Sequence, residues 1–176
     1  MILDFCSTII MMNPIRRIMR GSCIWSYLTL LGTVNISEDG DGMITGVYLP
    51  CSNLPAMDQC ETSALDEAAK QINQYLAGKR SEFDLDLRYD GSDFRSRVME
   101  ELNNIPYGEV RTYRQIAEVI GYPNSSRAVG TACRENPLPI LVPCHRVIPS
   151  TGGIGNYSGG VSIKRRLLEI EGVHID

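Results

Sequence analysis

A cysteine and a histidine stand side by side in this chain, at Cys144 and His145, shortly after the apolar run at residues 139–142. Thiolate is the reactive form of cysteine, and a nearby base lowers the pKa of a thiol, so the pair could supply an activated nucleophile. The apolar run predicts a strand, on which adjacent side chains point to opposite faces and cannot hydrogen bond to each other. Taken alone, the dipeptide is better explained as a buried structural cysteine. The flanking segments must decide between the two interpretations.

Five short motifs accompany this pair in order along the chain. They are Ser-Arg-Ala-Val-Gly at 126–130, Asn-Pro-Leu-Pro-Ile at 136–140, Pro-Cys-His-Arg-Val at 143–147, Gly-Asn-Tyr-Ser-Gly-Gly at 155–160 and Leu-Leu-Glu-Ile-Glu-Gly at 167–172. Together they resemble the O6-alkylguanine-DNA alkyltransferase family, also called methylated-DNA–protein-cysteine methyltransferases. The resemblance covers residues 92–176 well, residues 27–50 weakly and the first two dozen residues not at all.

The resemblance implies an α/β + α fold in two parts. Residues 1–85 would form a small α/β scaffold domain similar to ribonuclease H, with residues 1–22 as an extension. Residues 86–91 would be a linker. Residues 92–176 would form a catalytic, DNA-binding domain of the helix-turn-helix, winged-helix type.

The local pattern of the N-terminal half predicts strands followed by a helix. Residues 24–36 and 43–49 are rich in β-forming side chains and flank a turn signal at 38–42, which indicates a hairpin. Ser63 and Asp66 form a capping-box-like start to a helix that stops at Gly78. Its expected apolar face consists of Leu65, Ala69, Ile72 and Leu76. Residues 1–80 carry no recognisable chemistry, so a scaffold role is expected.

Helices dominate the prediction for the C-terminal half. Ser92 caps the first, Thr112 begins a short one through Val119, and Ser125 or Ser126 begins a third that reaches about Glu135. Two helices joined at this spacing are typical of a DNA-reading pair, although many helical hairpins bind nothing. A last helix is expected over residues 164–170, with glycine 172 just past its end.

The resemblance also implies a set of catalytic residues. Cys144 would attack the alkyl carbon on O6 of guanine, while His145 takes the thiol proton through a water and Glu171 orients His145. Without the resemblance, Glu171 would be interpreted as a surface carboxylate at a helix end. Asn136 would tie the second helix of the pair to the strand leading into Cys144. Tyr113 would donate a proton as the O6–alkyl bond breaks.

A base pocket and a DNA-binding surface follow from the same resemblance. The residues expected to contact the base or its alkyl group are Tyr113, Pro139, Val147, Tyr157 and Ser158. A base cannot react inside the stack, so it must be extruded. Arg127 would enter the duplex through the minor groove to fill the gap, and the plainer alternative is a phosphate contact. The residues expected to face DNA are Thr112, Ser126, Arg127, Ala128 and Arg134.

Charge is unevenly distributed over the 176 residues, whose formal net charge is −4. Residues up to Asp90 include seven Lys and Arg and twelve Asp and Glu. The rest of the chain includes ten Lys and Arg and nine Asp and Glu. The overall charge argues against indiscriminate nucleic-acid binding. A locally basic face on an acidic protein suits a modest DNA footprint that one part of the chain provides.

The six cysteines show no C-x-x-C spacing. Reduced thiols are expected rather than a disulfide framework, with thiolate metal ligands at Cys6 and Cys23 or at Cys51 and Cys60 as the alternative to simple burial. No cofactor is expected, because a thiolate performs the chemistry itself. No apolar run is long enough to cross a bilayer, and the start lacks a signal-peptide pattern. We therefore expect a cytoplasmic monomer, near the nucleoid or in a eukaryotic nucleus, whose partner is double-stranded DNA containing O6-alkylguanine.

Three classes of function remain open from the sequence. The first is a single-use alkyltransferase acting on O6-alkylguanine, with O4-alkylthymine as a second candidate lesion. The next is a non-enzymatic DNA-binding module, either a winged-helix regulator or a lesion binder; such lesion binders lack the cysteine that stands at Cys144 here. The last is a thiol hydrolase that acts on an acyl substrate. It would turn over, whereas an alkylated thiol is a thioether without a leaving group.

Overall fold

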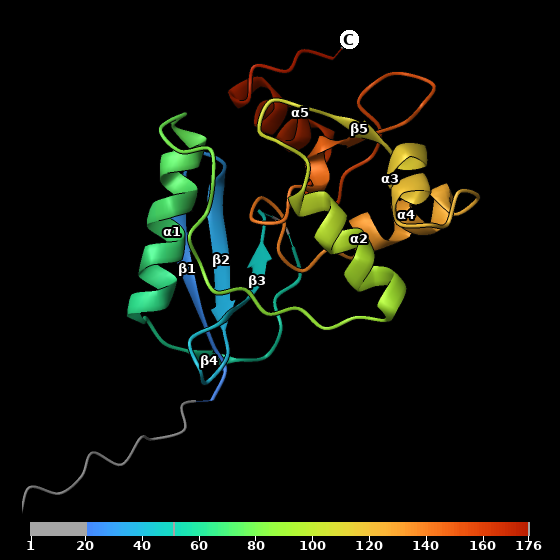
Figure 1. The fold of residues 1–176 in the computed structure, drawn as a ribbon. Coiled ribbons are helices and arrows are strands. Elements are labelled where there is room, and N and C mark those ends of the chain that lie inside the picture. The colour runs from blue at the N-terminus through green and yellow to red at the C-terminus, as the bar shows by residue number, and fades with distance from the viewer. Residues whose placement is uncertain (1–20, 51, 176) are drawn as a thin grey trace, which may run out of the picture.

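The computed structural model describes residues 21–50 and 52–175. Almost all of the extension expected at residues 1–22 lies outside the described residues, as do Cys6 and Cys51. Within them, a sheet with one covering helix comes first along the chain, and a cluster of helices lies beside it (Figure 1). Among these residues, no helix is both long and apolar enough to span a bilayer.

The sheet has four strands in the order β3-β2-β1-β4. Their bounds are Cys23–Thr29 for β1, Gly32–Glu38 for β2, Ile44–Tyr48 for β3 and Asp58–Gln59 for β4. The β2–β3 hairpin confirms the turn predicted at 38–42, where Asp39 Oδ1 accepts hydrogen bonds from the amides of Asp41 and Met43. The apolar stretch at 24–36 is two strands, because Gly32 adopts a φ of 102° and turns the chain back on itself.

Helix α1 (Ser63–Leu76) packs on β1 and β2 with the predicted apolar face fully buried. Its cap lies one residue earlier than predicted: Thr62 Oγ1 accepts a hydrogen bond from the Leu65 amide at 3.2 Å, so the proposed capping role of Ser63 was wrong. The helix ends as expected, with Gly78 at a φ of 67°.

The C-terminal helices begin close to the predicted residues. Ser92 caps α2 (Asp93–Asn103), and Thr112 caps α3 (Tyr113–Val119) in a capping box with Gln115. Helix α4 (Ser126–Arg134) follows Ser125, whose side chain makes no capping hydrogen bond. Helix α5 (Val161–Ile170) starts three residues earlier than expected. A short parallel pair, β5 (Arg111–Thr112) and β6 (Val147–Ile148), joins the start of α3 to the segment after Cys144.

The strand predicted over residues 139–142 is absent, and that prediction was wrong. The chain turns there: Ile140 has a φ of 76°, and the Val142 amide donates to the Leu138 carbonyl at 2.8 Å. Prolines at 137, 139 and 143 have no N–H to donate to a strand ladder, which explains why these apolar residues do not join a sheet. A single 3₁₀ turn, η1 (Cys144–Arg146), follows directly.

The sheet and the helix cluster share one continuous core. The Val47 amide in β3 donates to the Pro137 carbonyl at 2.8 Å. Part of the expected linker also belongs to the sheet side, because Ile44 exchanges backbone hydrogen bonds with Asp86 and Arg88. Because of these contacts, side chains of the N-terminal half lie close to those of the C-terminal half.

Cys23 and Cys60 form a disulfide, so the expectation of reduced thiols was wrong for these two residues. The parallel pairing of β1 with β4 brings them together, with 5.6 Å between their Cα atoms. No group of three or more His, Cys, Asp or Glu side chains within the described ranges could hold a metal ion.

Candidate active site

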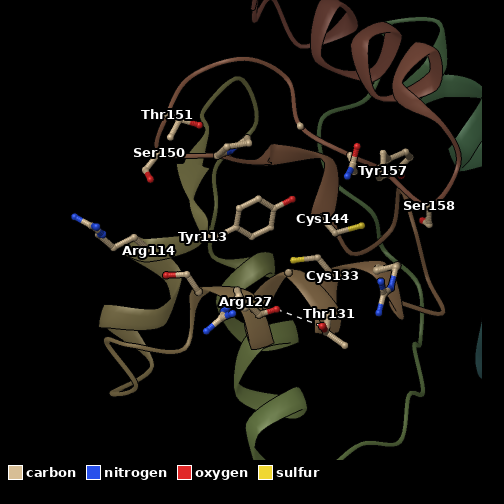
Figure 2. Close-up of a pocket in the computed structure, with 16 residues that line it drawn as sticks. Tyr113, Arg114, Arg127, Thr131, Cys133, Cys144, Ser150, Thr151, Tyr157 and Ser158 are labelled. Atoms are coloured by element: carbon tan, nitrogen blue, oxygen red, sulfur yellow. Dashed lines mark hydrogen bonds between the residues drawn. The ribbon is translucent and has the colours of Figure 1, made fainter.

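A cavity of about 900 Å³ opens between α3, α4 and the loop at residues 149–158, with Cys144 in its lining (Figure 2). Seven of the residues predicted from the sequence line it together: Tyr113, Ser126, Arg127, Arg134, Cys144, Tyr157 and Ser158. Arg114 adds a third guanidinium to the lining, which suits a polyanionic ligand.

Cys144 is held in place by the side chain of Asn136. Asn136 Nδ2 donates to the Val142 carbonyl at 2.9 Å and lies 3.1 Å from Cys144 Sγ. Asn136 Oδ1 accepts from the Leu138 amide at 3.0 Å. These contacts link the end of α4 to the segment before Cys144, as the resemblance implied, although that segment is a turn and not a strand. Both residues are buried, so the sulfur is fixed relative to the cavity.

The resting form of Cys144 is the thiol. Burial raises the pKa of Cys144, and the hydrogen bond from Asn136 and the charge of Lys164 offset the rise only in part. The Lys164 ammonium is itself buried, with Nζ 2.6 Å from the Val147 carbonyl, and burial lowers its pKa to about 8. A thiol in this setting needs a base to accept its proton when it reacts.

His145 and Glu171 form a buried pair behind Cys144, outside the cavity lining. His145 Nε2 lies 3.0 Å from Glu171 Oε1. Burial lowers the pKa of His145, so the ring is neutral at rest, and its Nδ1 is buried without a hydrogen-bond partner among the described residues. A neutral imidazole with one nitrogen held by a carboxylate and the other unpaired is arranged to accept a proton.

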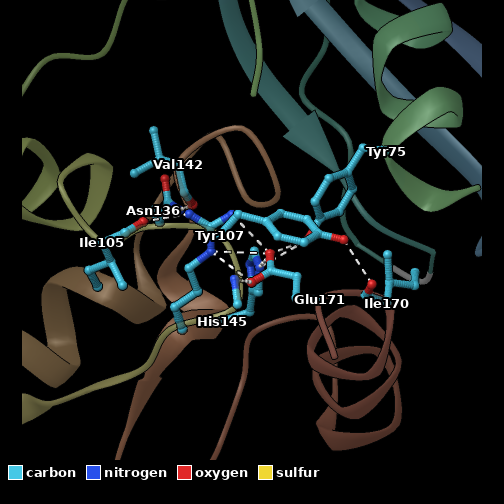
Figure 3. Close-up of polar contacts among 10 residues, drawn as sticks. Tyr75, Ile105, Tyr107, Asn136, Val142, His145, Ile170 and Glu171 are labelled. Atoms are coloured by element: carbon cyan, nitrogen blue, oxygen red, sulfur yellow. Dashed lines mark hydrogen bonds and ion pairs between the residues drawn. The ribbon is translucent and has the colours of Figure 1, made fainter. Parts of the chain in front are cut away.

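Glu171 is not the surface carboxylate that its position at a helix end suggested. It is 6% exposed and accepts from five groups: Tyr75, His145, Arg146 twice through Nε and Nη2, and the Gly108 amide (Figure 3). Burial alone would raise the pKa of its carboxyl, but the hydrogen bonds from His145 and Arg146 prevail and lower it to about 2. The carboxylate is therefore ionised at neutral pH.

Sequence reasoning missed two residues that bind this carboxylate. Arg146 was noticed only as a letter of its motif, yet it pairs with Glu171 and donates from Nη1 to the Ile105 carbonyl at 2.6 Å. Tyr75 lies on α1, where no chemistry was expected. One signal was present: a tyrosine near the apolar face of an amphipathic helix must find a partner for its buried hydroxyl.

Four other predicted residues do not line the cavity. Pro139 is buried where the chain folds back towards Val142 and is not among the residues that line the cavity, so its contact with the alkyl group stays a prediction. Val147 is buried, and its carbonyl accepts from Lys164. Thr112 caps α3, and Ala128 is exposed on α4 next to Arg127. A second thiol that was not predicted, Cys133, lines the cavity, and burial raises its pKa strongly.

The fold and the site define a class: proteins that present one buried cysteine, backed by an imidazole and a carboxylate, to a cavity rimmed with arginines. The family described as "6-O-methylguanine DNA methyltransferase, DNA binding domain" matches residues 93–173. A methylated-DNA–protein-cysteine methyltransferase of Mycobacterium tuberculosis is 49% identical over 111 residues, which are 63% of this chain and 67% of that protein. One of Metallosphaera sedula is 36% identical over 148 residues, 84% of this chain and 91% of that protein.

A solved structure shows the same fold. The crystal structure of Mycobacterium tuberculosis OGT in complex with DNA superposes with a TM-score of 0.79 at 37% identity, covering 85% of this chain and 92% of that one. The chain belongs to the methylated-DNA–protein-cysteine methyltransferase family.

Proposed function

We propose that this protein repairs DNA by transferring an alkyl group from O6 of guanine to Cys144. Its family membership supports the reaction, and one observation supports the residue: Cys144 is the cavity-lining thiol that has an imidazole and an ionised carboxylate behind it. Cys133 lines the same cavity, but among the described residues no hydrogen bond joins its sulfur to a histidine or a carboxylate.

The transfer would proceed by displacement at the alkyl carbon. The Cys144 proton passes through a water to His145 Nδ1, and Glu171 stabilises the imidazolium. The sulfur then forms a bond to the alkyl carbon, the O6–carbon bond breaks, and its electron pair goes to the guanine. Tyr113 supplies the proton that the guanine needs; burial, then the nearby thiols, raise the pKa of its hydroxyl to about 12, so it is protonated at rest. The product is a thioether, which water does not cleave, so each molecule reacts once.

The DNA would bind across α3 and α4 with the damaged guanine extruded into the cavity. Arg127 is exposed at the cavity lining near the start of α4, a position from which it could replace the base in the minor groove or contact a phosphate. Thr112, Ser126, Ala128 and Arg134 would contribute the surrounding surface. Tyr157 and Ser158 would contact the base and its alkyl group, and the loop glycines beside them permit a close approach of backbone.

We also infer how the chain divides into domains. Residues up to 85 would act as a ribonuclease H-like scaffold, residues 86–91 as the connection and residues 92–176 as a winged-helix catalytic domain that works as a monomer. O4-alkylthymine is a second lesion that the same cavity could accept.

Intact-protein mass spectrometry tests the reaction directly. After incubation with duplex DNA containing O6-methylguanine, the protein should gain the mass of one methyl group, and peptide mapping should place it on Cys144. Cys144→Ser should remain unmodified yet still bind the DNA, whereas the matched control Cys133→Ser should react. A label on Cys133, or more than one methyl group per molecule, would contradict the proposal, and sustained turnover of an acyl ester would favour the thiol-hydrolase alternative.

A further inference from the structure

The hydroxyl of Tyr75 reaches from α1 into the buried pair of His145 and Glu171 (Figure 3). It lies 2.6 Å from Glu171 Oε1 and 3.1 Å from His145 Nε2. All three side chains are buried. The contact therefore joins the N-terminal half of the chain to the groups that are proposed to activate Cys144.

The three distances fix which atom carries which proton. Burial, and then the charge of Glu171, raise the pKa of Tyr75 far above its ordinary value, so its hydroxyl keeps its hydrogen. That hydrogen goes to the carboxylate, which is the stronger and nearer acceptor. The Tyr75 oxygen is then an acceptor towards His145 Nε2, as Glu171 Oε1 is at 3.0 Å. Two acceptors that face one ring nitrogen require the hydrogen of the neutral imidazole to be on Nε2.

We propose that Tyr75 is a positioning residue for the transfer: with Glu171, it holds His145 in the tautomer whose Nδ1 is free to accept the thiol proton. The inference rests on the proposed function for its consequence in catalysis, but the tautomer itself is a property of the protein alone. A residue of the N-terminal half, which sequence reasoning assigned only a scaffold role, thereby takes part in preparing the nucleophile.

The hydroxyl can be removed without disturbing the packing of the ring. The Tyr75 ring lies 5.4 Å from the Phe83 ring and 6.2 Å from the Tyr107 ring between centroids, and these contacts need no oxygen. Tyr75→Phe keeps them and leaves Glu171 with His145, Arg146 and the Gly108 amide. What it removes is one of the two acceptors on Nε2, so the preference for one tautomer and one ring orientation weakens.

Tyr107→Phe is a matched control. Tyr107 is a neighbouring tyrosine whose hydroxyl donates to the Ile170 carbonyl at 2.8 Å, one residue before Glu171. Both variants lose one oxygen near the end of α5. Tyr107→Phe loses the hydrogen bond to the Ile170 carbonyl, whereas Tyr75→Phe loses the contacts with the imidazole and the carboxylate.

The first measurement is the single-turnover rate constant of methyl transfer from duplex DNA. We expect Tyr75→Phe to react about tenfold more slowly than the wild type, the size of effect for a lost hydrogen bond to a charged group, while Tyr107→Phe reacts at close to the wild-type rate. DNA affinity should be the same for all three. A Tyr75→Phe rate within about twofold of the wild type, or an equal loss in both variants, would overturn the proposal.

The second measurement is the set of ring ¹⁵N chemical shifts of His145. The chain has two histidines, so His174 serves as the reference within each spectrum. The wild type should carry hydrogen on Nε2 and none on Nδ1, and Tyr75→Phe should shift towards a mixture. A wild-type ring with its hydrogen on Nδ1 would overturn the proposal even if the variant fails to fold. Absence of methyl transfer in the wild type would instead refute the proposed function and leave this comparison valid.

Discussion

Replacing Glu171 by Gln should destabilise the protein strongly at neutral pH and much less in acid. The carboxylate is the acceptor for the guanidinium of Arg146, which is only 6% exposed. An amide keeps a single oxygen and turns an NH₂ group towards donors. The substitution therefore leaves a buried positive charge without its counter-ion.

Two estimates give the size of the lost stability. Lowering the pKa of Glu171 from 4.5 to about 2 corresponds to roughly 3 kcal/mol, at about 1.4 kcal/mol per pKa unit. Breaking a buried ion pair by removing one partner costs about 3–5 kcal/mol. Because the pKa is lower in the folded state, this stabilisation is fully present above pH 4.5 and is lost as the pH falls towards 2. Against a total stability of roughly 5–15 kcal/mol, the loss should be plain.

Chemical denaturation of the wild type and Glu171→Gln at a series of pH values from 7 to 3 measures this directly. The difference in free energy of unfolding should be about 3–5 kcal/mol at pH 7 and should narrow below pH 4.5. Glu169→Gln is the control, since Glu169 lies exposed on α5, two residues before Glu171. A difference that does not change with pH would refute the assignment of this stability to the ionised carboxylate, as would a variant as stable as the wild type at pH 7.

Two further predictions concern the cavity. Arg127→Ala should slow methyl transfer from duplex DNA far more than transfer from the free base, because an exposed side chain at the rim can assist extrusion but not the chemistry; equal slowing in single-turnover assays with both substrates would argue against that role. Methylation of Cys144 should lower the thermal unfolding midpoint. The sulfur lies 3.1 Å from Asn136 Nδ2, and added volume in such a packed site costs about 1–3 kcal/mol. A benzyl group should lower the midpoint more, unless the open cavity accommodates the ring. An unchanged or raised midpoint for the methylated protein would show that the site tolerates its product.

The sequence by itself determined those features that depend on neighbouring residues. Ser92 and Thr112 cap the helices predicted for them, because a cap is a bond between a side chain and an amide three residues away. The hairpin turn at residues 38–42 and the apolar face of α1 follow from equally local patterns. The short motifs also identified the family and brought Cys144, His145 and Glu171 to attention before any geometry was known.

Local patterns were insufficient where the backbone departs from the commonest conformation. An apolar run before Cys144 suggested a strand, yet three prolines without N–H groups and the positive φ of Ile140 make it a turn. That turn buries Pro139, which is not among the residues that line the cavity. The pairing of Cys23 with Cys60 likewise depends on which strand lies beside β1, and cysteine spacing does not reveal this.

Only the tertiary structure decided what surrounds Glu171. Its carboxylate receives Tyr75 from α1 and the Gly108 amide from the loop after α2, together with Arg146 from η1. No periodic pattern in the sequence predicts these contacts, because each depends on how separate elements pack against one another. Whether a carboxyl group is ionised, and which imidazole nitrogen it holds, depends on burial and on the donors within hydrogen-bonding distance. Both conditions are created by packing, so they exist only in the folded chain.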